Sequence, residues 1–123
     1  EKVLFCVYGT LKAGYGNHWL LREAKHLGDF ITPANYTLFD GGFPIVERGG
    51  NTAVHCELYE TDDERVIEGV FELEGCDRVQ DSPRSWYTYD KLKTPHGEAV
   101  IFVMNQGRSR RNIVLPDGKW GRR

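Results

Sequence analysis

A glycine-containing segment near the start of the chain has residue types that could bind an anion. The apolar run that ends at Val7 leads into Tyr8-Gly9-Thr10-Leu11. Because glycine has no side chain and tolerates unusual dihedral angles, an anion can approach the backbone N–H groups of such a loop closely. Preorganised N–H donors suit a carboxylate or the oxyanion of an acyl-transfer reaction. The same residues also fit an ordinary turn, since glycine is common in turns.

A carboxylate that could move protons lies much later in the sequence. Glu74 follows Val70 by four residues and Phe71 by three, so a continuing helix would place Glu74 on its apolar face. Loss of water would raise the pKa of this carboxyl group above about 4.3, as a proton shuttle near neutral pH requires. The alternative is a helix that ends early, with Glu74 hydrated and Gly75 as its C-cap. With the loop, Glu74 predicts a small acyl-transfer site.

Other polar residues do not indicate a nucleotide or metal site. The glycines of Lys12-Ala13-Gly14-Tyr15-Gly16 lack the spacing of a phosphate-binding loop. His18 and His26 are eight residues apart and could share a helix face. Since no carboxylate accompanies them, surface or capping roles are favoured over metal binding.

The elements that must position the loop begin with a strand. Residues 2–8 are apolar almost throughout, which is typical of a strand buried on both faces, and we expect it to be central in the sheet. A helix is expected over residues 18–27, with Asn17 as its N-cap and Gly28 as its left-handed stop.

The middle of the chain reads as strands separated by turns, and Pro33 interrupts the first of them. The strands are expected at residues 30–39, 43–46 and 53–60, and a later hairpin at 85–92 and 98–104. Residues 105–111 are polar and basic and are expected to form a mobile loop.

The helix that would carry Glu74 begins at a capping box, Thr61-Asp62-Asp63-Glu64. Its apolar stripe consists of Val66, Ile67, Val70, Phe71 and Leu73. Two short helices among clustered strands predict a single α+β domain over residues 1–123. We expect a curved, mixed or antiparallel sheet that forms a partly closed barrel.

The composition is that of a globular protein without a strong electrostatic field. Hydrophobic residues make up 40% and aromatic residues 12% of the chain, which excludes a disordered protein. With 16 basic and 18 acidic residues the net charge is -2, which argues against binding to nucleic acid or membrane. Small molecules or other proteins are the expected partners.

The cysteines and the apolar runs bear on location. Cys6, Cys56 and Cys76 are widely spaced and form no Cys-x-x-Cys pair, which argues against a disulfide framework and a zinc site. No apolar run approaches the roughly 18 residues of a membrane helix, and no signal-peptide pattern is present. A reducing, cytoplasmic location is expected.

A series of short motifs extends through the chain. It comprises residues 5–14, Asn17-His18, Leu20-Leu21, Gly42-Phe43-Pro44, residues 54–60, Leu73-Glu74-Gly75, Arg84 and Asp117-Gly118-Lys119-Trp120. This series resembles the gamma-glutamyl cyclotransferase-like family, in particular its small gamma-glutamylamine cyclotransferase-like branch. In that family a Tyr-Gly-Ser/Thr-Leu loop binds a glutamyl group and a Glu before Gly moves protons.

The resemblance implies an enzyme that converts a gamma-glutamyl amine or amide to 5-oxoproline and a free amine. The substrate's own α-amine attacks its γ-carbonyl group, and no metal or organic cofactor is needed. Glu74 is implied as the catalytic proton carrier. The implied substrate-binding residues are Tyr8, Gly9, Thr10, Leu11, Phe71 and Arg84.

The chain departs from the family pattern at three positions. The family's Leu-Asp before the catalytic Glu is Val70-Phe71 here, a strand Gly is Cys56, and a Tyr is Ser82. Phe71 would narrow the pocket towards substrates with an apolar or aromatic leaving amine. The same departures support a second hypothesis, a binding or regulatory protein, for example in host–virus or toxin–antitoxin conflict.

A third hypothesis is a module that contacts RNA. Such a module would combine a basic run with aromatic side chains, which here are Arg108, Arg110 and Arg111 with Trp86, Tyr87 and Tyr89. Because a short basic run is usually a solvated loop, this hypothesis ranks last.

Overall fold

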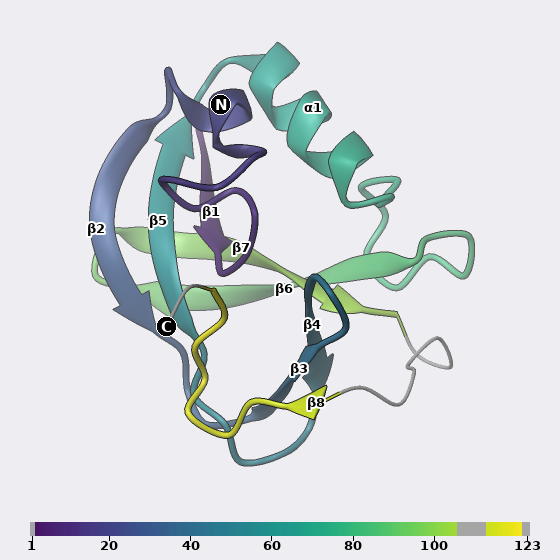
Figure 1. The fold of residues 1–123 in the computed structure, drawn as a ribbon. Coiled ribbons are helices and arrows are strands. Elements are labelled where there is room, and N and C mark those ends of the chain that lie inside the picture. Colours follow the sequence, from purple (N-terminus) through teal and green to yellow (C-terminus); the bar gives the residue numbers. More distant parts are fainter. Residues whose placement is uncertain (1, 106–112, 122–123) are drawn as a thin grey trace.

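A computed structural model describes residues 2–105 and 113–121 (Figure 1). Eight strands, one α-helix and one 3₁₀ helix lie within these ranges. The elements in chain order are β1 (Val3–Val7), η1 (His18–Leu21), β2 (Lys25–Ile31), β3 (Tyr36–Asp40), β4 (Pro44–Arg48), β5 (His55–Thr61), α1 (Glu64–Leu73), β6 (Tyr87–Thr94), β7 (Gly97–Met104) and β8 (Ile113–Val114).

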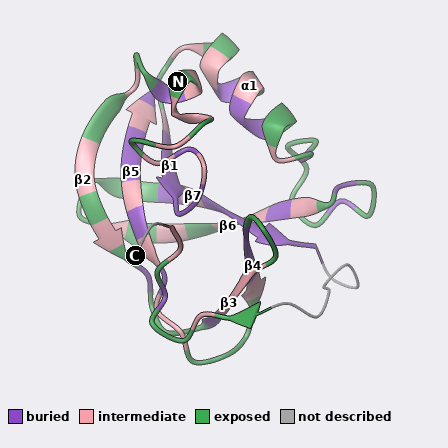
Figure 2. Cartoon of the chain, viewed as in Figure 1, coloured by how far each residue is buried: buried purple, intermediate pink, exposed green. Residues whose placement is uncertain are grey.

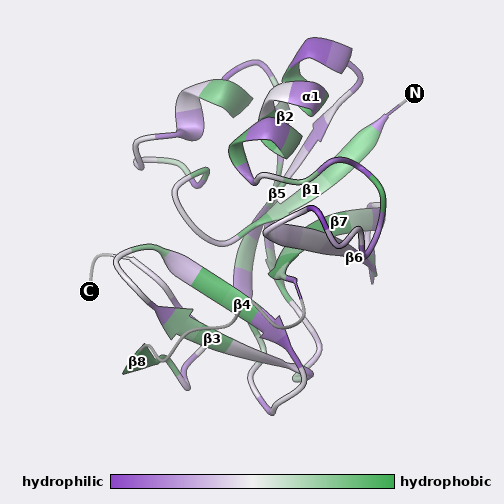
Figure 3. Ribbon diagram, turned by 90° about the vertical axis from the view of Figure 1, so that its right-hand side faces the viewer, coloured by the Kyte–Doolittle hydropathy of each residue, from purple (hydrophilic) through white to green (hydrophobic). Residues whose placement is uncertain are grey.

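The strands form two sheets. The larger has the order β2-β5-β1-β7-β6, and the smaller has the order β4-β3-β8. β1 is central, as expected, and pairs antiparallel with β5 and parallel with β7, so the sheet is mixed. The smaller sheet and α1 lie on opposite sides of the larger sheet (Figures 1 and 3), and together the sheets form a partly closed barrel.

Alternation along β1 supplies two separate cores. Leu4, Cys6 and Tyr8 belong to the cluster that packs against the smaller sheet. Phe5 and Val7 belong to the cluster beneath α1. Because successive side chains of a strand point to opposite faces, one apolar strand can serve both cores. Figure 2 shows the result, a β1 that is buried along most of its length.

The helix α1 covers one face of the larger sheet. Asp63 is its N-cap and accepts a hydrogen bond from the N–H of Arg65 at 2.9 Å. The helix carries both hydrophobic and hydrophilic segments (Figure 3), and its buried face consists of Ile67, Val70 and Phe71. The expected capping box begins too early, since Thr61 is the last residue of β5 and its hydroxyl accepts from the N–H of Asp63.

The helix expected over residues 18–27 is wrong. Only His18–Leu21 is helical, as a 3₁₀ turn, and Lys25–Ile31 forms the edge strand β2. β2 pairs antiparallel with β5, with a bulge between His26 and Gly28, where Gly28 has a φ of 106°. The glycine therefore serves a bulge and not a helix end. Strand pairing outweighs the helical spacing of the leucines, because it covers the outer edge of β5 and packs Leu27 and Phe30 against the core.

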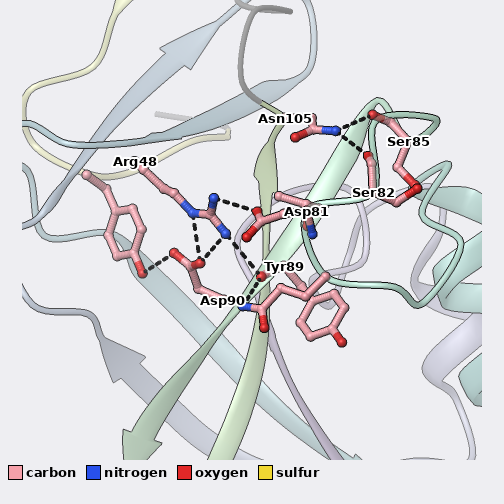
Figure 4. Close-up of polar contacts among 10 residues, drawn as sticks. Arg48, Asp81, Ser82, Ser85, Tyr89, Asp90 and Asn105 are labelled. Atoms are coloured by element: carbon pink, nitrogen blue, oxygen red, sulfur yellow. Dashed lines mark hydrogen bonds and ion pairs between the residues drawn. The ribbon is translucent and has the colours of Figure 1, made fainter.

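The smaller sheet is tied to the larger one by the guanidinium group of Arg48 (Figure 4). From β4 it donates to Asp90 of β6 at 2.8 Å, to Asp81 at 2.7 Å and to the carbonyl group of Tyr89 at 3.4 Å. Tyr36 of β3 donates to the other oxygen of Asp90 at 3.2 Å. In the adjoining loop, Asn105 donates to the carbonyl groups of Ser82 and Ser85.

Within the described residues, no helix combines the length and the apolar character needed to span a membrane. Residues 106–111, with Arg108, Arg110 and Arg111, lie outside the described ranges.

Candidate active site

A cavity of about 280 Å³ lies where β1 ends, between the end of α1 and the turn before β4. This volume is near the lower end of the range for small-molecule sites, about 300–1,000 Å³. Its walls are Cys6, Val7, Tyr8, Gly9, Thr10, Leu11, Asn17, Phe43, Pro44, Leu73, Glu74, Tyr87 and Phe102. Glu74 is the one charged side chain in this lining, and the cavity is otherwise apolar or neutral.

The loop after β1 is folded so that its backbone N–H groups stay available. The carbonyl group of Gly9 accepts from the N–H of Lys12 at 3.0 Å, and that of Thr10 accepts from the N–H of Asn17 at 3.0 Å. These bonds use the loop's carbonyl groups. No described residue accepts a hydrogen bond from the N–H of Gly9, Thr10 or Leu11. The loop can therefore offer these donors to an anion in the cavity.

The hydroxyl group of Thr10 is oriented by Asn17. The side-chain amide of Asn17 donates to Thr10 Oγ1 at 2.8 Å. A hydroxyl group has a single proton to donate. Among the described residues no acceptor receives that proton, so Thr10 can donate it to a ligand beside the backbone amides.

Gly9 is required by the close approach of Pro44. A Cβ atom at Gly9 would lie 2.3 Å from Pro44 Cγ, well inside van der Waals contact. The turn before β4 thus rests directly on the loop and closes one side of the cavity. Phe43, in the same turn, is 51% exposed and gives the cavity mouth an apolar surface together with Leu73, which is 41% exposed.

Glu74 is the C-cap of α1. It keeps helical dihedral angles, and its N–H donates to the carbonyl group of Val70 at 3.1 Å. The helical spacing therefore continues through Glu74 and turns its side chain inward, where it lines the cavity. Burial raises the pKa of the Glu74 carboxyl group to about 7. A carboxyl group with this pKa can both accept and donate a proton near neutral pH.

Two tyrosines line the same cavity as Glu74. Tyr8 donates its phenol proton to the carbonyl group of Phe102 at 2.6 Å, and Tyr87 donates to the carbonyl group of Pro44 at 3.2 Å. Burial raises the pKa of both phenols, and the negative charge of Glu74 raises both further. Both phenols therefore remain protonated near neutral pH.

The structure brings most of the sequence-predicted site residues together. Tyr8, Gly9, Thr10, Leu11 and Glu74 all line the same cavity, although Glu74 is more than sixty residues away from the loop in sequence. This placement favours the interpretation of the loop and of Glu74 as a site over the alternatives of a plain turn and a hydrated helix end.

Phe71 and Arg84 are not brought to the cavity. Phe71 is 6% exposed and packs in the core, with its ring centroid 5.1 Å from that of Phe102 and 6.0 Å from that of Phe5. Phe71 lies one helical turn before Glu74 but has a different environment, because the cavity lies at the end of the helix. Arg84 is exposed in the loop before β6, where its N–H lies 3.4 Å from Ser82 Oγ.

Sequence reasoning missed other cavity residues. The sequence patterns predict a helix cap at Asn17, a strand residue or nucleic-acid contact at Tyr87, and a turn at Phe43 and Pro44. The motif series includes Asn17 and the Gly-Phe-Pro turn, but neither they nor Tyr87 are predicted as site residues. The hairpin register that pairs Tyr87 with Met104 follows from the turn between β6 and β7. The contact of Tyr87 with Pro44 is a long-range feature that no local pattern predicts. The Gly-Phe-Pro motif was the available signal for the turn.

The chain is similar to known proteins along most of its length. Residues 5–122 match the family described as "Gamma-glutamyl cyclotransferase, AIG2-like". The chain belongs to this family. A provisionally named gamma-glutamylcyclotransferase of Vibrio cholerae is 34% identical over 98% of this chain and 96% of its own length. The Escherichia coli family protein YtfP is 32% identical over 79% of this chain and 78% of its own length.

Solved structures of similar proteins share the gamma-glutamyl cyclotransferase fold. Protein PH0828 from Pyrococcus horikoshii superposes with a TM-score of 0.76 at 28% identity, covering 95% of this chain and 88% of that one. The solution structure of Escherichia coli ytfP has a TM-score of 0.64 at 28% identity, covering 98% of this chain and 96% of that one. The expected family and fold class are thereby confirmed.

Proposed function

We propose that this protein is a gamma-glutamylcyclotransferase that releases 5-oxoproline and a free amine from a gamma-glutamyl amine or amide. The substrate's α-nitrogen forms a bond to its own γ-carbonyl carbon, and the bond from that carbon to the leaving nitrogen breaks. The reaction is an intramolecular acyl transfer, so no water is consumed. Holding the substrate in a folded conformation supplies much of the rate enhancement.

Glu74 carries the protons in this proposal. As a carboxylate it takes a proton from the α-ammonium group and frees the attacking lone pair. As a carboxylic acid it returns that proton to the leaving nitrogen when the tetrahedral intermediate collapses. The second proton that the attacking nitrogen loses as the ring amide forms is taken up by the released amine, which departs as an ammonium ion. The observation that supports this most strongly is the position of Glu74, the one charged side chain in the lining of a cavity shared with the loop. Burial there raises the pKa of its carboxyl group to about 7, as a proton carrier near neutral pH requires.

The loop after β1 supports the anionic parts of the substrate. The N–H groups of Gly9, Thr10 and Leu11 and the hydroxyl group of Thr10 are donors without an acceptor among the described residues. Such donors suit the α-carboxylate or the oxyanion of the intermediate. The exposed rings and chains at the mouth, Phe43 and Leu73, favour a leaving amine with an apolar portion.

The departures from the family pattern give no reason to prefer the hypothesis of a binding or regulatory protein. Phe71 and Cys56 lie in the apolar cores, and Ser82 bonds to Asp77 at 2.7 Å in the loop after α1. None of the three lines the cavity. A small-molecule gamma-glutamyl substrate and a cytoplasmic location remain parts of the proposal.

The test is turnover of a panel of gamma-glutamyl amines and amides, with 5-oxoproline measured directly. Glu74→Gln keeps the shape of the side chain and removes the base, so we expect kcat to fall by about 100-fold or more. Glu72→Gln, on the exposed face of the same helix, should match the parent. Absence of 5-oxoproline with every compound, or equal turnover by the Glu74→Gln variant, would reject the proposal.

A further inference from the structure

Tyr87 is a buried polar group of the cavity that the mechanism above does not use. It begins β6, lines the cavity, and donates its only phenol proton to the carbonyl group of Pro44 at 3.2 Å. Tyr8 likewise donates its only phenol proton to a backbone carbonyl group, that of Phe102, at 2.6 Å. With their protons committed, both phenol oxygens can act towards a ligand only as hydrogen-bond acceptors.

These acceptors share the cavity with the carboxylate of Glu74. The negative charge of Glu74 raises the pKa of both phenols. The three side chains come from β1, from the end of α1 and from β6, and they meet in the same cavity. One part of the cavity therefore presents acceptors only.

The loop after β1 presents the opposite polarity. Its free groups are the N–H groups of Gly9, Thr10 and Leu11 and the hydroxyl group of Thr10, all of which are donors to the ligand. A ligand that matches both parts must carry an anionic group and a cationic N–H donor a short distance apart. The α-carbon of an amino acid, with its carboxylate and ammonium groups, has this arrangement.

We propose that Tyr87 accepts a hydrogen bond from the α-ammonium group of the gamma-glutamyl substrate and, with Tyr8, holds the attacking nitrogen beside Glu74. This assignment rests on the proposed function and adds a substrate-binding residue to it. It makes the site selective for ligands with a free α-amine, because without that amine the acceptors would be buried with no donor. Ligands whose α-amine is acylated or missing should therefore bind more weakly.

The test compares two competitors that differ only in the α-amine. L-Glutamine is the smallest gamma-glutamyl amide, and glutaramate is the same molecule without the amine. Their inhibition constants are measured against turnover of a gamma-glutamyl substrate by the parent and by Tyr87→Phe. We expect Tyr87→Phe to raise the inhibition constant of glutamine by about 10-fold, since only glutamine donates to the phenol oxygen. The inhibition constant of glutaramate should stay within about two-fold of the parent value.

The two-ligand comparison separates this role from a structural one. Tyr87→Phe also removes the hydrogen bond to Pro44, but a displaced turn before β4 would weaken the binding of both competitors equally. Tyr89→Phe is the matched control, since Tyr89 lies in the same strand and its phenol donates to the carbonyl group of Arg78 outside the cavity. It should change neither constant. Thr10→Val should weaken both competitors, because both carry the carboxylate.

Equal weakening of both competitors by Tyr87→Phe would overturn the assignment of Tyr87. So would a parent protein that binds glutaramate as well as glutamine. If the Glu74→Gln variant is inactive while either of these results holds, the proposed function stands and only the assignment of Tyr87 fails. If the parent converts no gamma-glutamyl compound, both proposals fail together.

Discussion

Glu74 is a residue whose environment suits catalysis at a cost in stability. Its carboxyl group has a pKa of about 7 in the folded protein, against an ordinary value of 4.5. The folded state therefore holds the proton more tightly than the unfolded state. Below pH 4.5 the group is protonated in both states and costs nothing, and as the pH rises through 7 the folded state must bury a charge.

This difference predicts how stability depends on pH. Glu74→Gln should be more stable than the parent at pH 8, by about 3 kcal/mol at most, and the difference should shrink towards zero at pH 4.5. Denaturant unfolding of both proteins at several pH values measures it, with Glu72→Gln as control. A difference that stays constant between pH 4.5 and 8 would show that the carboxyl group titrates normally.

Phe71 illustrates how a single position can be misjudged from spacing alone. Its ring packs against Phe5, Phe102 and Tyr89, and the guanidinium group of Arg78 lies 5.2 Å from its centroid. It therefore supports the core beneath α1, which holds the helix that carries Glu74.

Phe71→Asp should consequently unfold the protein and not change its substrate preference. Loss of the ring and burial of a carboxylate should cost at least about 4 kcal/mol, while Phe71→Leu should cost about 1–2 kcal/mol. Thermal unfolding measures both, and Phe71→Leu should keep the parent's relative rates across leaving amines. A folded Phe71→Asp variant with altered preference would place Phe71 at the site after all.

At the scale of elements, the cavity depends on how closely the loop after β1 and the turn before β4 approach each other. Gly9 permits this approach, because any side chain there would collide with the ring of Pro44. The carbonyl group of Pro44 also accepts the proton of Tyr87. Movement of this turn would therefore disturb both the donors and the acceptors of the cavity.

Gly9→Ala should lower kcat/KM by about 10- to 100-fold while the protein stays folded, since displacement by about 1 Å is enough to misalign a substrate. Gly16→Ala is the control within the same loop, because a Cβ atom at Gly16 would meet nothing within 4 Å. Steady-state kinetics and circular dichroism of the two variants measure the effect. Similar kcat/KM values for Gly9→Ala and the parent would mean that Pro44 can shift to admit the methyl group without disturbing the cavity.

For the whole molecule, the cluster around Arg48 holds the smaller sheet against the larger one. Asp90 accepts from both Arg48 and Tyr36 and its side chain is 22% exposed, whereas Asp81 accepts from Arg48 and is 57% exposed. The Asp90 interaction should therefore be less weakened by solvent.

Asp90→Asn should thus destabilise the protein by about 1–2 kcal/mol, and Asp81→Asn by less than about 0.5 kcal/mol. Urea unfolding of each variant, alone and combined with Arg48→Met, gives the two coupling energies. A larger coupling for Asp81 than for Asp90 would contradict the ranking by exposure.

Local patterns in the sequence are enough to predict the family, the central strand, the hairpin of β6 and β7, and the two principal parts of the candidate site. These features depend on local pattern: an apolar run, a turn between alternating segments, a glycine loop and a carboxylate at helical spacing. Burial of both faces of β1 also follows from the sequence, because a strand that is apolar throughout must be covered on both faces.

Which residues surround these segments depends on packing between parts of the chain that are distant in sequence. The leucines after Asn17 have helical spacing, yet pairing with β5 makes Lys25–Ile31 a strand. Phe71 and Glu74 share a helix face, yet one enters the core and the other a cavity beyond the helix end. Tyr87 reaches the cavity because β6 packs beside the turn before β4, where its phenol donates to the carbonyl group of Pro44. Each of these outcomes depends on contacts between residues distant in sequence, which local spacing cannot specify.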